Sequence, residues 1–139
     1  MMDEVEELAK GLAALADRNP VSFPLAVSNL AEERPDLVEI PVCLEPPPNA
    51  GPWQQRWHED AKHLYRVVAL VGDYGIQLRH LKHTLGSVAF QEAQKILRSS
   101  GAVVESKEPR LGMGDKRRNL IVLRTHGAAD QHGRLGFDE

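Results

Sequence analysis

The N-terminal residues follow a helical pattern of apolar positions. Apolar side chains recur every three or four residues at Val5, Leu8, Leu12 and Leu15. This spacing predicts an amphipathic helix over residues 3–18, with an acidic outer face and an apolar stripe that needs a surface to pack against. The helix is expected to end before Pro20, because the residue before a proline avoids helical dihedral angles. A second short helix is expected at about residues 25–33.

Residues 37–54 break the helical pattern. The run 37–44 is aliphatic and β-branched, but Pro41 lies within it and cannot donate to a sheet ladder. The run is therefore expected to be an edge strand or an irregular docking segment. The stretch 46–54 contains four prolines, which is typical of a stiff linker. We place a domain boundary there, after a mainly helical N-terminal arm at residues 1–45.

The strongest helical signal follows this linker. Apolar side chains recur at 4-3-4-3 spacing at Trp57, Ala61, Leu64, Val68 and Val71. They predict a helix over about residues 54–71, and Leu78, Leu81 and Leu85 mark a brief second one. Ser87 is a natural N-cap for a third helix that reaches Ser99 or Ser100. Two aliphatic runs, 102–105 and 120–124, flank a polar loop and predict a hairpin with a long tip.

The order of these elements carries a resemblance to a known family. Residues 64–87 and 90–105 resemble winged helix-turn-helix domains of the MarR-like bacterial regulators, in element order and apolar spacing. The resemblance covers about residues 56–126. It implies an α+β fold in which a winged-helix domain of three helices and a β-hairpin wing occupies residues 55–126. Residues 127–139 are then a flexible tail.

Charge is divided along the chain. Residues 1–60 carry four Lys and Arg against twelve Asp and Glu, whereas residues 61–126 carry twelve against five. The overall net charge of −3 therefore conceals a basic segment behind an acidic one. A basic segment of this kind indicates an anionic partner.

Two groups of polar side chains fit double-stranded DNA as that partner. The outer face of the third helix carries Ser87, Gln91, Gln94, Lys95 and Arg98. Glutamine can pair with adenine, and lysine or arginine with guanine, at about 1–3 kcal/mol of discrimination for each pair. Ser87, Val88 and Gln91, nearest the start of the helix, would sit deepest in the groove.

The hairpin tip forms the second group of candidate DNA contacts. Its cations are Lys107, Arg110, Lys116, Arg117 and Arg118. They suit sequence-independent contacts with phosphates, because phosphate neutralisation releases condensed counterions. For both groups the alternative is a solvated polar surface.

Other chemistry is not expected. Six histidines show no convincing metal-ligand spacing, and Cys43 is the single cysteine, so we predict neither a metal, a cofactor nor an enzymatic activity. Trp53 and Trp57 are expected to hold the N-terminal segment against the first helix after the linker. The sequence has no membrane span and no secretory signal, which favours a cytoplasmic, nucleoid-associated protein.

The leading hypothesis is a DNA-binding protein, either a transcription regulator or an accessory factor in replication or plasmid maintenance. A homodimer or a protein partner could form through residues 1–45, although the apolar stripe of residues 3–18 could equally dock on its own chain. The alternative is a winged-helix subunit that binds other proteins in a larger complex. A further idea is that the acidic segment covers the basic one until DNA displaces it.

Overall fold

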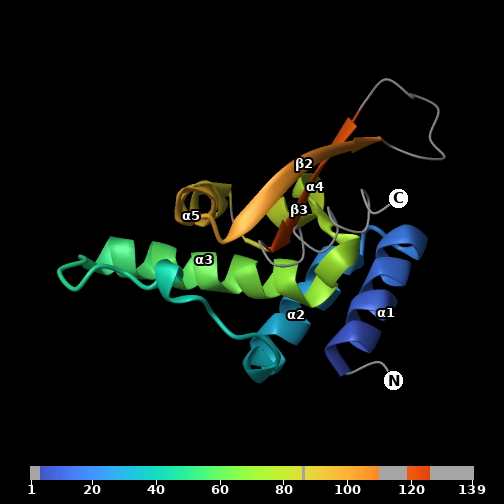
Figure 1. Ribbon diagram of the computed structural model, residues 1–139, viewed down its shortest axis with the longest axis horizontal. Helices are drawn as coiled ribbons and strands as arrows, with labels where there is room; N and C mark the ends of the chain where they lie inside the picture. Colours follow the sequence, from blue (N-terminus) through green and yellow to red (C-terminus); the bar gives the residue numbers. More distant parts are fainter. Residues whose placement is uncertain (1–3, 86, 110–118, 126–139) are drawn as a thin grey trace, which may run out of the picture.

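The described part of the chain forms an α+β arrangement (Figure 1). The computed structural model describes residues 4–85, 87–109 and 119–125. These residues form five α-helices, three 3₁₀ turns and a three-stranded antiparallel sheet. The helices are α1 Glu4–Arg18, α2 Phe23–Glu33, α3 Pro52–Val71, α4 Leu78–Lys82 and α5 Ser87–Ser100. The strands are β1 Ile76–Gln77, β2 Val103–Pro109 and β3 Asn119–Thr125.

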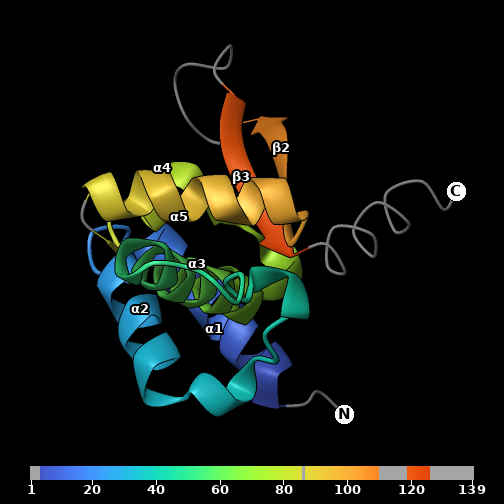
Figure 2. The ribbon, with the colours of Figure 1, turned by 90° about the vertical axis from the view of Figure 1, so that its left-hand side faces the viewer.

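Helix α3 is the central element of the fold. Pro52 occupies its first turn, where a missing backbone donor is harmless. Its buried side chains are Ala61, Leu64, Val67, Val68, Leu70 and Val71. They point to more than one side of the helix, so α3 can be covered from both sides. Helices α1 and α2 lie on one side of it, and α5 with the sheet lies on the other (Figures 1 and 2).

The apolar stripe of α1 docks on the chain's own core. Ala9 and Leu12 are buried, and α1 packs against α3. Leu12 belongs to the same apolar cluster as Phe23 of α2 and Leu97 of α5. The boundary predicted at residues 46–54 therefore separates two segments that share one core. Because Leu12 is covered, it is not available for the dimer contact that the sequence left open.

Helices α1 and α2 do not lie against α5. Helices α1 and α2 lie on the far side of α3 from α5 (Figure 2). These two helices therefore do not cover the outer face of α5, and electrostatic shielding of the basic segment by the acidic one stays a prediction. The acidic side chains of α1 line its outer face, where Glu4, Glu6 and Glu7 are exposed.

Residues 35–45 form an irregular segment that packs on the rest of the chain, which confirms one of the two alternatives predicted for residues 37–44. They contain two 3₁₀ turns, Pro35–Leu37 and Val42–Leu44, and no strand pairs with them in the described part of the chain. The edge-strand alternative is wrong, because Pro41 removes a donor in the middle of the run. Leu44 is fully buried, and its carbonyl oxygen lies 2.9 Å from Nδ1 of His58 on α3.

Trp53 does not hold this segment in place. Trp53 is 67% exposed, because the first turn of α3 extends past the elements that cover the rest of the helix. The expectation that both tryptophans fasten the N-terminal segment is wrong for Trp53, whereas Trp57, one turn further into the helix, is half-buried.

The sheet has the order β1-β3-β2. Strands β2 and β3 form the predicted hairpin, with a register that runs from Val103 opposite Thr125 to Pro109 opposite Asn119. The short strand β1 pairs with the other edge of β3. Gly75 precedes β1 with a φ of 76°, and a Cβ there would lie 2.4 Å from Cγ1 of Val122. Only glycine fits this approach of the two strands.

Candidate nucleic-acid interface

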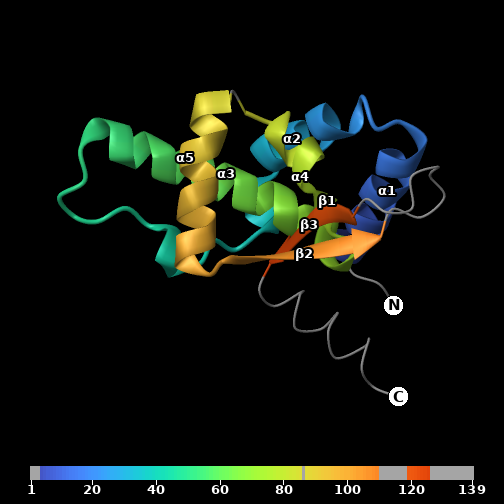
Figure 3. The same cartoon turned by 90° about the horizontal axis from the view of Figure 1, so that it is seen from above.

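Helix α5 is held by its apolar face and presents the other face to solvent. Phe90, Ala93 and Leu97 are buried, and α5 lies across α3 (Figure 3). The 3-4 spacing of these residues places them on one side of the helix, so the side chains half a turn away point outward. Strands β2 and β3 rise beside this outer face, away from α1 and α2 (Figure 2). The helix and the hairpin therefore lie on the same side of α3.

The outermost stripe of α5 consists of Val88, Gln91 and Lys95. Val88 is 72% exposed, Gln91 is exposed, and the side chain of Lys95 is 73% exposed. Nζ of Lys95 lies 3.4 Å from Oε1 of Glu92, one turn earlier. An exposed pair of this length contributes little to stability, so the ammonium group remains accessible to an anion.

Glu105 of β2 binds two of the predicted DNA-contacting side chains. Its Oε1 accepts a hydrogen bond from Nη2 of Arg98 at 2.9 Å, and its Oε2 accepts from Nε of the same guanidinium. Nε2 of Gln94 donates to the same Oε2 at 3.3 Å. The predicted polar face is therefore divided: Gln94 and Arg98 turn toward the sheet, whereas Gln91 and Lys95 point to solvent. We name the residues Gln94, Arg98 and Glu105 the Glu105 cluster.

The hairpin carries the remaining predicted residues. Lys107 does not lie in the tip, as predicted, but on β2 opposite Ile121, because this strand continues to Pro109; its side chain is exposed. Ser87 is the first residue of α5, but its side chain lies outside what the structure describes. The tip residues Arg110, Lys116, Arg117 and Arg118 also lie outside the described residues, so their contact with phosphates stays a prediction.

Some cations of the basic segment serve the fold. Arg124 of β3 is buried, with Nη2 3.5 Å from the carbonyl oxygen of Tyr74 and Nη1 3.5 Å from Oγ of Ser106. Lys62 of α3 pairs with Glu45 at 3.0 Å and with a second carboxylate on its own helix. The charge counted along the sequence therefore exceeds the charge that the α5 surface presents.

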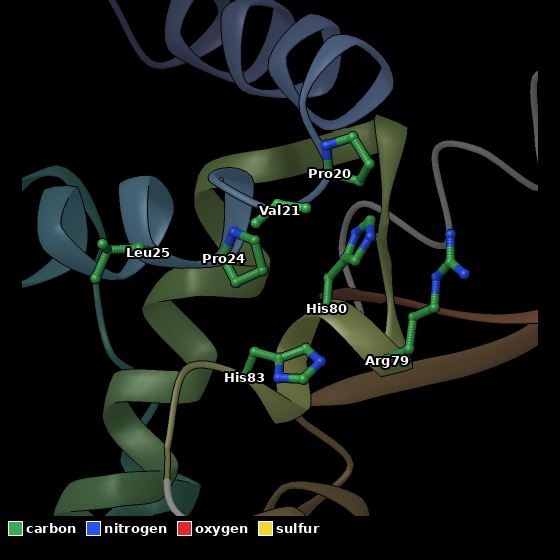
Figure 4. Close-up of a pocket in the computed structure, with 7 residues that line it drawn as sticks. All are labelled: Pro20, Val21, Pro24, Leu25, Arg79, His80 and His83. Carbon is green, nitrogen blue, oxygen red and sulfur yellow. The ribbon is translucent and has the colours of Figure 1, made fainter.

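A hollow of about 440 Å³ lies at the junction of α2 and α4 (Figure 4). Apolar side chains from the α1–α2 turn and from α2 line one part of it, and Arg79, His80 and His83 line the other. His80 is buried and packs edge-on against Phe23, with ring centroids 5.3 Å apart. Burial lowers the pKa of His80, and the nearby Arg79 acts in the same direction. The ring is thus neutral at pH 7 and joins α4 to α2.

Neither a metal cluster nor a membrane-spanning helix is present among the residues that the structure describes. Within residues 4–85, 87–109 and 119–125, no three His, Cys, Asp or Glu side chains gather in a way that could hold a metal ion. Over the same residues, no helix has the length and apolar character needed to cross a bilayer.

The fold of the described residues assigns the protein to the α+β class. It is an α+β protein in which the helix α5 and a β-hairpin share one side of a central helix. Comparison with known proteins adds no relative, since no family model, no curated protein and no solved structure matches the chain.

Proposed function

We propose that the protein binds double-stranded DNA as a winged-helix protein, with α5 as the recognition helix and the β2–β3 hairpin as the wing. The order α3, β1, α4, α5, β2, β3 supports this assignment, because it is the element order of a winged helix-turn-helix. The proposal depends most on one observation: α5 and the hairpin lie on the same side of α3, opposite the acidic helices α1 and α2.

The proposed mechanism follows from the exposed side chains. The major groove is about 12 Å wide and accepts an α-helix, so α5 can place Gln91 and Lys95 against base edges. Lys107 and the hairpin then lie along the sugar-phosphate backbone, where contacts set register rather than sequence. The acidic outer face of α1 is repelled by the same polyanion, which favours approach of the DNA to the α5 side.

Such a protein would act as a transcription regulator or as an accessory factor in replication or plasmid maintenance. A single module of this size contacts a limited stretch of duplex, and a second copy on an adjacent half-site would raise the affinity.

A matched pair of charge reversals tests the proposal. Lys95→Glu combined with Lys107→Glu should weaken binding to a short random-sequence duplex by more than about tenfold at low salt. Loss of the Lys107 phosphate contact should also reduce the slope of log affinity against log salt by about 1. The control, Lys10→Glu with Arg18→Glu, makes the same change of charge on exposed positions of α1. Fluorescence anisotropy of a labelled duplex measures both variants.

The control should bind like the parent protein. Equal losses in the two variants would mean that net charge rather than the α5 surface governs binding, and unchanged affinity in the first variant would refute the proposed interface. Circular dichroism checks that both variants are folded, as expected for exposed positions.

A protein-interaction subunit is the second candidate, and the exposed Trp53 favours it. Tryptophan is enriched at the centres of protein interfaces, and this one is accessible at the first turn of α3. If the parent protein binds no duplex even at low salt, this second function replaces the first.

A further inference from the structure

One side chain on the outer stripe of α5 is apolar. Val88 lies in the first turn of the helix, is 72% exposed and is not part of the described core. Valine is a weaker helix former than the polar residues that usually occupy such positions, because its branched side chain loses rotamer freedom. Neither helix formation nor core packing therefore accounts for a valine at this position.

The neighbours of Val88 restrict what this part of the helix can recognise. Gln91 lies one turn further along the same stripe and is exposed. Arg98, the side chain of α5 best suited to guanine, is bound through two of its nitrogens by Glu105. Among the described side chains of the first two turns of α5, the two in the exposed class, Val88 and Gln91, offer an aliphatic group and a carboxamide.

These two groups match the two bases of an A·T pair. In the major groove thymine presents a C5-methyl group, which apolar side chains contact, and adenine presents N7 and N6, which glutamine can bind together. We propose that α5 selects A·T pairs, with Val88 packed on a thymine methyl and Gln91 hydrogen-bonded to adenine. This inference rests on the proposed function, since it names which duplex the α5 surface prefers.

Uracil-containing DNA isolates the methyl contact. The alternating duplexes poly(dA-dT) and poly(dA-dU) share the same hydrogen-bonding groups, and the second lacks only the thymine methyl. The parent protein should bind poly(dA-dT) roughly fourfold more tightly, the effect expected for burial of about one methyl group. Val88→Ala should abolish most of this difference and still bind both duplexes.

Two further variants complete the test. Gln91→Ala should reduce the preference for poly(dA-dT) over poly(dG-dC) and leave the thymine-to-uracil difference unchanged. Leu25→Ala alters an exposed aliphatic residue on α2, outside α5 and the hairpin, and should change neither preference.

The outcomes separate this inference from the proposed function. If the parent protein binds poly(dA-dT) and poly(dA-dU) equally well, or if Val88→Ala keeps the parent's difference between them, the methyl contact is refuted while duplex binding stands. If the parent prefers poly(dG-dC), A·T selection is refuted. Absence of binding to all three duplexes would overturn both proposals.

Discussion

Helices α1 and α5 lie on opposite sides of α3 and bury similar side chains against the core. Ala9 and Leu12 are covered in α1, and Ala93 and Leu97 are covered in α5. Their outer faces differ in charge, since α1 carries three glutamates in its first turn and α5 carries none. The apolar contact that holds each helix therefore says nothing about which partner its outer face suits.

Polar contacts join separate elements on both sides of the molecule. On the α1 and α2 side they connect separate elements: Arg34 pairs with Glu4 at 3.3 Å, and Oγ of Ser28 lies 2.9 Å from Nε2 of His63. On the α5 side the Glu105 cluster occupies one edge of the helix and leaves the stripe of Val88, Gln91 and Lys95 exposed. Both sides are thus fastened to the fold by polar contacts, and on the α5 side these contacts lie beside the exposed stripe rather than across it.

Truncation of Phe23 should have the largest effect on stability, because it removes a contact that joins the two sides of the molecule. Phe23 is 1% exposed on α2 and packs against His80 of α4, so it links the two sides of the molecule. Phe23→Ala should lower the free energy of unfolding by about 3–5 kcal/mol, through lost burial and a residual cavity. Urea denaturation followed by circular dichroism measures the change. The control Leu25→Ala, on the same helix but 65% exposed, should cost less than about 0.5 kcal/mol.

The shape of the Phe23→Ala curve is as informative as its midpoint. Because both sides share one core, tryptophan fluorescence from α3 and the helical signal should change together in a single transition. Two separate transitions, with only the earlier one shifted, would show that α1 and α2 unfold independently of the rest.

The sequence predicted the elements better than their contacts. Helices α1, α3 and α5 and the β2–β3 hairpin occur where periodicity placed them, because each element's apolar pattern is a local property. The docking of α1 on α3 does not follow from the sequence, since an apolar stripe does not identify its partner. Residues 37–44 were ambiguous for a similar reason: aliphatic content suits a strand, and the proline within it does not.

The candidate site was predicted in part. Helical spacing correctly exposes Gln91 and Lys95. It could not show that Glu105 binds Arg98, because this contact depends on how β2 passes α5 in space. The sequence places Val88 near the start of the helix, whereas its exposure depends on how α5 packs on the core. The DNA-binding role and the hairpin-tip cations remain predictions.

Acidification should weaken the α1 and α2 side through His63. Burial is the main cause that lowers the pKa of His63, Arg66 acts in the same direction, and Glu32 and Asp60 oppose it. The unfolded chain titrates near the ordinary value of about 6.5, so below that pH it binds a proton that the folded ring resists. Stability should therefore be complete above about pH 6.5 and fall as the pH drops toward the lowered value in the folded protein.

His63→Gln isolates this contribution. Glutamine can keep a hydrogen bond to Ser28 and cannot titrate, so the decline of Tm between about pH 7 and pH 5 should be shallower than in the parent. Part of the decline should persist, because burial also lowers the pKa of His80. A parent Tm that does not change over this range, or identical slopes in the two proteins, would contradict the assignment.

Neutralisation of Glu105 has the smallest expected effect and tests whether Arg98 on the α5 side can be made accessible. Glu105→Gln removes the carboxylate that binds Arg98, whose side chain is 54% exposed, so the guanidinium can reach a phosphate. Affinity for a random duplex should rise by a few fold, with a salt slope steeper by about 1. Because the ion pair is partly exposed, the cost in stability should stay below about 1 kcal/mol.

Glu7→Gln, the same change of charge on the exposed face of α1, should alter neither affinity nor slope. Weaker binding by Glu105→Gln would mean that Glu105 positions Arg98 for DNA rather than withholding it, and Arg98 would then belong to the accessible stripe.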